Sequence, residues 1–323
     1  MPIDNSNMLK VIEDFPHQCK TALELAKGMT VSGKINNIII AGMGGSAVGG
    51  DLLKLYLHDL KIPVTTIRDY KLPNYANEST LVFAVSYSGN TEETLAAYED
   101  ALRKKTKIIA VTSGGKLGDI SNKTIKIPKG LQPRAALGYL FFPMLGVLVN
   151  SGIANENSAE INEMLDVLSQ KEDFRQFGEK IAKKIGSRTP LIYSSEQFGA
   201  VAYRWKTQFN ENSKVAAFSH VFSEMNHNEI VGYQSMSRDR FIAIFIRDNA
   251  DNERIKKRID ITKEIISQKV DVEEIYTKGT YLLSRLFSGL YYADFTSYYL
   301  ALQNKTDPTP VHVIENLKKK LAE

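Results

Sequence analysis

Residues 37–46 read Asn37-Ile38-Ile39-Ile40-Ala41-Gly42-Met43-Gly44-Gly45-Ser46, and this stretch decides the predicted fold. The three successive isoleucines are typical of a parallel strand that is buried on both faces. Glycines follow at once and lead into a helical pattern that begins near Asp51. A strand, a glycine-rich turn and a helix in this order predict one unit of a doubly wound α/β domain.

The same rhythm continues along the chain. Short apolar runs between helical patterns predict parallel strands at residues 62–67, 80–85, 107–112 and 124–127, and again at 190–193, 216–219, 240–246 and 270–276. Helices are predicted at residues 5–30, 135–149, 197–209 and 282–302, with a polar connection over 151–173. We therefore expect an α/β protein with two doubly wound parallel-sheet domains in tandem, spanning residues 1–152 and 153–323.

Bulk composition narrows the class of protein. A length of 323 residues suits about two domains. The net charge of +4 permits binding of small anions but is too small to indicate a nucleic-acid partner. The apolar run 135–149 is too short, and too interrupted by glycine and proline, to span a membrane. A single cysteine, Cys19, and an amino terminus without a signal-peptide pattern predict a cytoplasmic protein without disulfides.

The glycine-rich turn over 42–50 is the first candidate ligand site. Glycines let the backbone approach a ligand, and the helix that follows offers unpaired N–H groups to an anion. A dinucleotide fingerprint competes, since Gly42, Gly44 and Ala47 fit its spacing loosely. However, the second predicted strand ends in residues 67–69, Ile-Arg-Asp, which is not the clean acidic position that a dinucleotide site requires. A purely structural turn between strand and helix also remains open.

The stronger motif is Ser86-Tyr87-Ser88-Gly89-Asn90-Thr91, which follows the predicted strand at 80–85 and precedes a helix. The hydroxyls of Ser86, Ser88 and Thr91, together with N–H groups at the helix start, can surround a phosphate without a lysine. The absence of a Gly-Lys-Thr sequence excludes a P-loop nucleotide site. The alternative is that Thr91 only caps the helix, which accounts for one hydroxyl of the three.

Two further residues carry chemistry suited to catalysis. Arg134 follows the fifth predicted strand, at the same sheet edge as the two loops above, where its fork of donors can hold a developing oxyanion. An ordinary surface ion pair is the alternative for Arg134. Glu211 ends a predicted helix among asparagines, and a carboxylate shielded there can act as a proton-transfer base.

His227 lies in the polar segment Asn226-His227-Asn228-Glu229 and can shuttle protons near neutral pH. A metal site built on His220, His227 and Glu229 is disfavoured, because the spacing supplies no third well-placed ligand and no His-Glu-x-x-His pattern. A histidine with a purely structural role remains an alternative.

Together these segments resemble a known family. The motifs that carry the resemblance are Gly44-Gly45-Ser46, Ser86-x-Ser88-Gly89-Asn90-Thr91, Pro133-Arg134, Glu211-Asn212 and Asn226-His227-Asn228-Glu229. They are similar to those of the bifunctional phosphoglucose/phosphomannose isomerases of archaea and bacteria, which belong to the phosphoglucose isomerase superfamily and contain two flavodoxin-like SIS (sugar isomerase) domains. The motif over residues 86–91, here called the serine loop, marks SIS domains in general, whereas the last two motifs narrow the resemblance to this group. The resemblance covers nearly the whole chain.

The resemblance implies a role for each candidate residue. The sugar phosphate would be bound by Gly44, Gly45, Ser46, Ser86, Ser88 and Thr91. Arg134 would stabilise the enediolate, and Glu211 would move a proton between C1 and C2. His227 would assist ring opening from the neighbouring subunit, which implies a homodimer. A carboxyl-terminal lysine would also assist ring opening; we choose Lys318, with Lys305, Lys319 and Lys320 as alternatives.

The implied reaction is the interconversion of fructose 6-phosphate with glucose 6-phosphate and mannose 6-phosphate, without a metal or a cofactor. A carboxylate can remove a proton next to a carbonyl if fixed donors stabilise the enediolate and water is excluded. Two other interpretations remain. A non-catalytic SIS regulator would usually carry a helix-turn-helix segment, for which there is no room before residue 37. An amino-sugar phosphate isomerase would usually carry a glutamine-dependent domain, which is absent.

Overall fold

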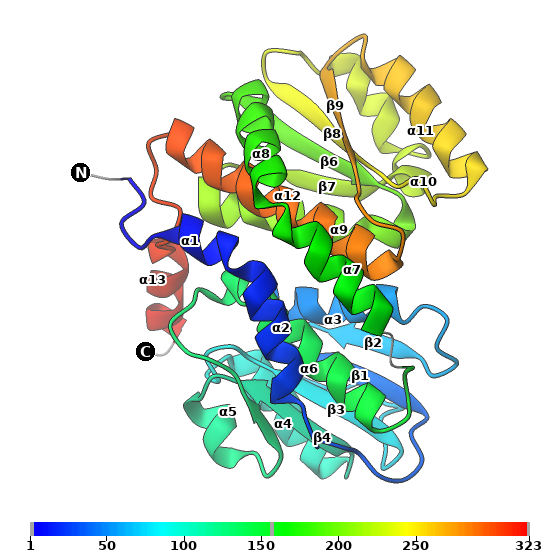
Figure 1. Cartoon of the computed structure of the whole chain (residues 1–323), viewed down its shortest axis with the longest axis vertical. Helices are drawn as coiled ribbons and strands as arrows, with labels where there is room; N and C mark the ends of the chain where they lie inside the picture. The colour runs from blue at the N-terminus through cyan, green and yellow to red at the C-terminus, as the bar shows by residue number, and fades with distance from the viewer. Residues whose placement is uncertain (1–2, 156–157, 322–323) are drawn as a thin grey trace. The chain divides into compact units, whose positions relative to one another are not determined.

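Figure 1 shows the computed structural model of the chain, which describes residues 3–155 and 158–321. The chain packs into two compact units. The first unit comprises Asp14–Leu165, and the second comprises Met1–Glu13 together with Asp166–Glu323. The predicted domain division after residue 152 stays a prediction, because these units are defined by packing alone.

The first unit is built on a five-stranded parallel sheet. Its strands are β1 (Asn37–Ala41), β2 (Val64–Ile67), β3 (Thr80–Val85), β4 (Lys107–Thr112) and β5 (Thr124–Lys126). The strand order is β2-β1-β3-β4-β5, with every neighbouring pair parallel. β3 is buried at all six positions, as its unbroken apolar sequence predicts. The flavodoxin-like doubly wound plan is therefore confirmed for this half.

Helices cover this sheet. They are α2 (Phe15–Leu25), α3 (Gly44–Tyr56), α4 (Glu92–Arg103), α5 (Gly115–Ile120), the 3₁₀ turn η1 (Pro133–Ala135) and α6 (Leu137–Asn150). The next helix, α7 (Ser158–Ser169), begins in the first unit and ends in the second. α6 is the predicted buried helix. The Gln18 amide on α2 holds its start, donating to Ala135 O at 2.9 Å and accepting from Gly138 N at 2.7 Å. Gln18 therefore fixes the segment that carries Arg134.

The helix predicted over residues 5–30 is two helices in the structure, α1 (Met8–Glu13) and α2. α2 has a proline in its first turn, where the missing N–H is not needed for a hydrogen bond within the helix. The same proline cannot continue a preceding helix, so α1 ends before it. α1 has its own start signal, since the Asp4 carboxylate accepts from Met8 N at 2.7 Å and Leu9 N at 3.1 Å. The single-helix prediction was therefore wrong, and the two parts belong to different units.

The second unit repeats the plan with four parallel strands. They are β6 (Thr189–Ser194), β7 (Phe218–Val221), β8 (Phe241–Arg247) and β9 (Asp271–Tyr276), in the order β7-β6-β8-β9. The helical segments are α8 (Lys171–Ile185), η2 (Glu196–Phe198), α9 (Gly199–Gln208), η3 (Phe209–Ser213), α10 (Phe222–Met225), η4 (Glu229–Ser235), α11 (Glu253–Ile266), α12 (Leu282–Gln303) and α13 (His312–Leu321). The second parallel sheet confirms the prediction of two α/β domains. In the described ranges, no helix combines the length and apolarity needed to cross a membrane.

Candidate active site

The carboxyl ends of β1 and β3 and the turn η1 approach one another closely in the first unit. A Cβ atom added to Gly42 would lie 2.9 Å from Val85 O, at the end of β3. One added to Gly45 would lie 2.9 Å from Pro133 O and 3.2 Å from Arg134 Cα. Only glycine permits this approach, so Gly42 and Gly45 bring three loops to one edge of the sheet. Gly44 begins α3 with a left-handed φ of +51°. Ser46 N and Ala47 N donate to Met43 O at 3.0 and 3.4 Å, which leaves the N–H groups of Gly44 and Gly45 without a partner in the described residues and open to an anion.

The loop between β3 and α4 gathers its hydroxyls into one turn. Ser86 Oγ and Thr91 Oγ1 lie 2.8 Å apart, and Gly89 N donates to Ser86 Oγ at 3.1 Å. Ser88 Oγ accepts from Asn90 N at 3.2 Å, with its side chain exposed to solvent. Thr91 occupies the cap position of α4, yet its side chain accepts no capping hydrogen bond. The alternative in which Thr91 only caps the helix is therefore wrong, and its hydroxyl belongs with Ser86.

Gly89 makes this loop possible. Its φ is +73°, and an added Cβ would lie 1.7 Å from Gly114 O and 2.9 Å from Thr112 Oγ1. The loop therefore rests directly on the backbone at the end of β4. Ser86 is 1% exposed beneath it, so the hydroxyl cluster forms only if the chain turns in this way.

We expect Gly89→Ala to disrupt the serine loop. Gly130→Ala is the matched control, because Gly130 also has a positive φ, of +99°, but no atom lies within 4 Å of its added Cβ. The control variant loses only the roughly 1–2 kcal/mol of left-handed strain, whereas Gly89→Ala adds a clash with fixed backbone. Denaturant unfolding and the Michaelis constant for a sugar phosphate measure the difference. Equal losses in the two variants would contradict the close approach.

Tyr87 joins the serine loop to the segment before Arg134, a role that no sequence motif predicted. Its hydroxyl donates to Pro128 O at 2.9 Å and accepts from Leu131 N at 2.9 Å. Burial raises the pKa of Tyr87, an effect that the hydrogen bond from Leu131 N partly offsets, so the hydroxyl keeps its proton. The only sequence signal was an aromatic residue between two serines, which does not say where the ring points.

We expect Tyr87→Phe to weaken phosphate-ester binding as well as stability. The change leaves a carbonyl and an N–H near the site unpaired, which costs about 1–3 kcal/mol. Tyr98→Phe is the control, since the Tyr98 hydroxyl on α4 donates to Ile120 O at 3.2 Å, at the end of α5. Urea unfolding and the Michaelis constant should both change in Tyr87→Phe, whereas in Tyr98→Phe only the free energy of unfolding should change. An unaltered Michaelis constant in Tyr87→Phe would refute the link.

Arg134 is buried in η1, with 2% of its surface exposed. The alternative of an ordinary surface ion pair is therefore wrong. A guanidinium removed from water needs charged or polar partners to offset the cost of desolvation. Its backbone lies against Gly45 in the first turn of α3, so the positive charge is built into the same edge of the sheet as the serine loop.

Glu211 lies in η3, a π-helical turn that continues α9. Such turns insert an extra residue and often occur at functional sites. The following residues hold the turn to α12: Asn212 Nδ2 donates to Ser297 Oγ at 3.0 Å, and Ser213 Oγ donates to Ser297 O at 2.6 Å. Lys214 Nζ donates to Glu211 O at 2.7 Å and to Asp307 O at 3.0 Å. These hydrogen bonds fix the backbone that carries Glu211.

A cavity of about 450 Å³ opens beside Glu211. Its walls come from η3 and from the segment that leads into α13, namely Asn210, Glu211, Lys214, Thr306, Asp307, Pro310, Val311, His312, Val313 and Ile314. Lys318 lies further along α13, on a helix with no buried residue. Lys305 follows α12 in a left-handed conformation. The choice of Lys318 over the neighbouring lysines stays a prediction.

His227 lies in the turn after α10. Its ring is exposed and makes no hydrogen bond or ion pair with another residue in the described part of the chain, while its N–H donates to Glu224 O at 3.0 Å. The turn is held on both sides. Asn226 Nδ2 donates to Thr262 Oγ1 at 2.9 Å, and the Glu229 carboxylate accepts from the Tyr193 hydroxyl.

The Tyr193 hydroxyl also accepts from Tyr233 at 2.7 Å, and burial raises the pKa of both tyrosines. His220 Nδ1 accepts from Val221 N at 2.8 Å. His220 and Glu229 are thus committed to partners other than His227, and no group of three metal-ligating side chains occurs in residues 3–155 and 158–321. The turn after α10 is thus fixed by its neighbours, while the ring of His227 is exposed to solvent.

The structure thus brings Gly44, Gly45 and Arg134 together at one sheet edge, and Ser86 and Thr91 together in the loop after β3. All of the predicted phosphate-binding residues belong to the first unit. Glu211, His227 and Lys318 belong to the second unit, on three separate segments.

Comparisons with known proteins agree across the chain. Residues 34–133 match the SIS domain model, and residues 174–321 match the model of the bacterial phospho-glucose isomerase C-terminal SIS domain. A relative from Caldicellulosiruptor bescii named bifunctional phosphoglucose/phosphomannose isomerase is 44% identical, covering 98% of this chain and 99% of its own length. One of the same name from Thermoplasma acidophilum is 40% identical, covering 96% and 98%. The structure of tagatose-6-phosphate ketose/aldose isomerase from Escherichia coli shares the fold, with 17% identity, a TM-score of 0.71 and 94% of each chain covered.

Proposed function

Because this chain belongs to the family of bifunctional phosphoglucose/phosphomannose isomerases, we propose that it interconverts fructose 6-phosphate with both glucose 6-phosphate and mannose 6-phosphate. The observation that carries this conclusion is similarity to such isomerases over nearly the full length of both chains. The first unit adds a hydroxyl cluster and a helix start suited to a phosphate ester, and the second adds a carboxylate beside a cavity.

In this proposal the phosphate lies at the edge of the first sheet. The first N–H groups of α3 and the hydroxyls of Ser86, Ser88 and Thr91 supply donors, and the partial positive charge of the helix start favours the anion. Hydrogen bonds within the loop already fix Ser86 and Thr91, so little side-chain entropy is lost on binding. Binding energy from the non-reacting phosphate orients the reacting carbons.

Glu211 is the proposed base. It takes a proton from C2 of the open-chain aldose, or from C1 of the ketose, and returns it to the neighbouring carbon. The enediolate between the two steps carries negative charge, which the Arg134 guanidinium is suited to stabilise. The enediolate has no configuration at C2, so a proton returned to one face gives the glucose epimer and to the other the mannose epimer. The hydrogen only moves between adjacent carbons, so the reaction needs no redox cofactor and, in this proposal, no metal.

Ring opening requires a proton to move from the anomeric hydroxyl to the ring oxygen. We assign this step to His227, assisted by Lys318. The exposed ring of His227, on a turn held at both ends, suits action on a substrate bound to another copy of the chain. The proposed enzyme is therefore a homodimer, in which each active site combines Glu211 of one subunit with His227 of its partner. We place this enzyme in the cytoplasm.

A coupled assay tests the proposed function. Fructose 6-phosphate should yield both glucose 6-phosphate and mannose 6-phosphate, each detected by its own dehydrogenation step, with the same rates in the presence of a chelator. Loss of activity on chelation would contradict the metal-independent mechanism. Binding of fructose 6-phosphate without turnover would instead favour a non-catalytic regulator.

A further inference from the structure

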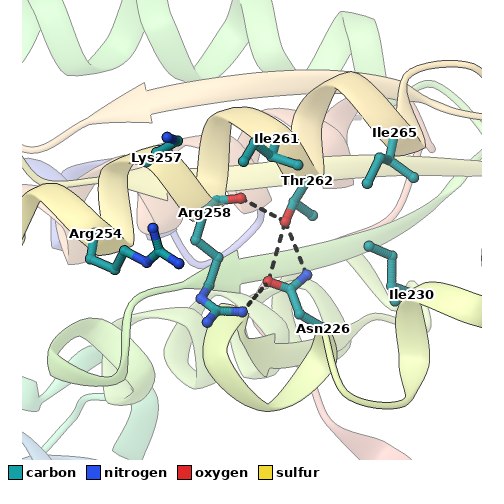
Figure 2. A pocket seen from close by; sticks show the side chains of 8 residues that line it. All are labelled: Asn226, Ile230, Arg254, Lys257, Arg258, Ile261, Thr262 and Ile265. Atoms are coloured by element: carbon teal, nitrogen blue, oxygen red, sulfur yellow. Dashed lines mark hydrogen bonds between the residues drawn. The ribbon is translucent and has the colours of Figure 1, made fainter.

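A second cavity lies in the second unit. It has a volume of about 310 Å³ and is formed between α11 and the residues that follow α10. Figure 2 shows its lining residues, which are Asn226, Ile230, Arg254, Lys257, Arg258, Ile261, Thr262 and Ile265. This volume is at the small end of the range for small-molecule sites, about 300–1,000 Å³.

The lining carries three positive charges and no negative one. Arg254, Lys257 and Arg258 are spaced so that they share one face of α11. None of them forms a salt bridge within the described residues, since the acids Glu253 and Asp260 of the same helix pair with Lys256 and Arg247 instead. By contrast, Arg188, Arg247 and Arg285 in the same unit each pair with a carboxylate.

The position of these charges is unfavourable for α11. Arg254 lies in the first turn of α11, where the helix dipole disfavours a cation, and the neighbouring like charges of Lys257 and Arg258 repel it. An anion bound in the cavity would offset both effects.

The polar groups of the cavity are already oriented. Asn226 Oδ1 accepts from Arg258 Nη1 at 3.1 Å and from Thr262 Oγ1 at 3.3 Å, as Figure 2 shows. The Arg258 guanidinium is therefore held in place, yet its Nε is buried without a hydrogen-bond partner in the described part of the chain. Buried donors are nearly always satisfied, so the unpaired Nε marks a guanidinium whose hydrogen-bonding capacity the described residues do not fully use.

The remaining lining is aliphatic. Ile230, Ile261 and Ile265 border the charged groups, and Ile261 and Ile265 are 47% and 46% exposed. A ligand with a short carbon skeleton would cover these side chains while its anionic groups meet the cations. We propose that this cavity binds a small organic polyanion with two or three carboxylate or phosphate groups on a short carbon skeleton.

Titration calorimetry on the full chain tests this proposal, with citrate and inorganic pyrophosphate as probes and saturating fructose 6-phosphate to occupy the substrate site. We expect one citrate per chain, with affinity that falls as salt rises. The double variant R254Q/K257Q should weaken citrate binding at least about tenfold, since it removes two charges. Both residues are exposed, so the fold should persist.

The control is K180Q/K183Q, which removes two exposed charges at the same spacing on α8 and should bind citrate like the wild type. Equal weakening in both double variants, or no binding of either probe at millimolar concentration, would overturn the proposal. So would binding of polyglutamate but not of the small probes, which would indicate an acidic protein partner. A dimer that dissociates in R254Q/K257Q without binding citrate in the wild type would identify a subunit contact instead.

Discussion

Glu211→Gln should abolish most isomerase activity while leaving the substrate bound. The substitution keeps the size of the side chain and its capacity for hydrogen bonds but removes the base, so kcat should fall about 10²–10⁴-fold. The Michaelis constant should change little, because the proposed phosphate contacts lie in the first unit. In D₂O the wild type should also exchange substrate hydrogen with solvent during turnover, and the variant should not.

The control for this prediction is Glu196→Gln, which neutralises an exposed carboxylate in the same unit. It should retain wild-type kcat. Denaturant unfolding of Glu211→Gln checks that the fold persists, since η3 is held to α12 through Asn212 and Ser213, which the substitution leaves in place. A Glu211→Gln enzyme with near wild-type kcat would remove Glu211 from the mechanism.

Mixing two inactive variants should restore activity. If each active site combines Glu211 of one subunit with His227 of its partner, a heterodimer of E211Q and H227N has one site with both substitutions and one site with neither. Random reassociation of equal amounts makes half of the dimers mixed, so we expect about a quarter of wild-type activity after exchange. Each variant alone should lose about 10²-fold or more, as expected for loss of an acid–base group.

The same experiment distinguishes the two arrangements of the site. If His227 acted within its own chain, every site of the mixed dimer would lack one group, and mixing would restore nothing. Mixing E211Q with Glu196→Gln serves as the control for activity lost during mixing, because half of the sites keep both groups whether or not the subunits exchange, and about half of wild-type activity should remain. Sedimentation should show a dimer throughout; an active monomer would contradict the shared site.

Local sequence determined much of the fold. The isoleucines before Gly42 and the apolar run before Ser86 each predicted a buried parallel strand, and both strands occur where expected. Short-range patterns succeed here because a strand covered on both faces requires apolar residues at every position, whatever surrounds it. The amino-terminal helix was predicted less well, since hydrophobic periodicity continued through the proline that begins α2.

The candidate site was only partly accessible from sequence. The hydroxyl motif could be recognised because its residues are contiguous, whereas Tyr87 acts through backbone groups about 40 residues further along the chain, at Pro128 and Leu131. The π-helical turn under Glu211 was also missed. It has no signature of its own, and its shape depends on hydrogen bonds to Ser297, far away in the sequence.

The sequence by itself therefore determined the alternation of strands and helices, the glycine and serine turns at the strand ends, and the family. These follow from contacts between near neighbours and from motifs that are continuous along the chain. Only the tertiary structure decided that Gly45 lies against Arg134, that the Thr91 hydroxyl pairs with Ser86 instead of capping its helix, and that three cations of α11 share one cavity. The physical reason is that close packing and the pairing of buried polar groups are settled between segments distant in sequence, and no local pattern records which partner each group will find.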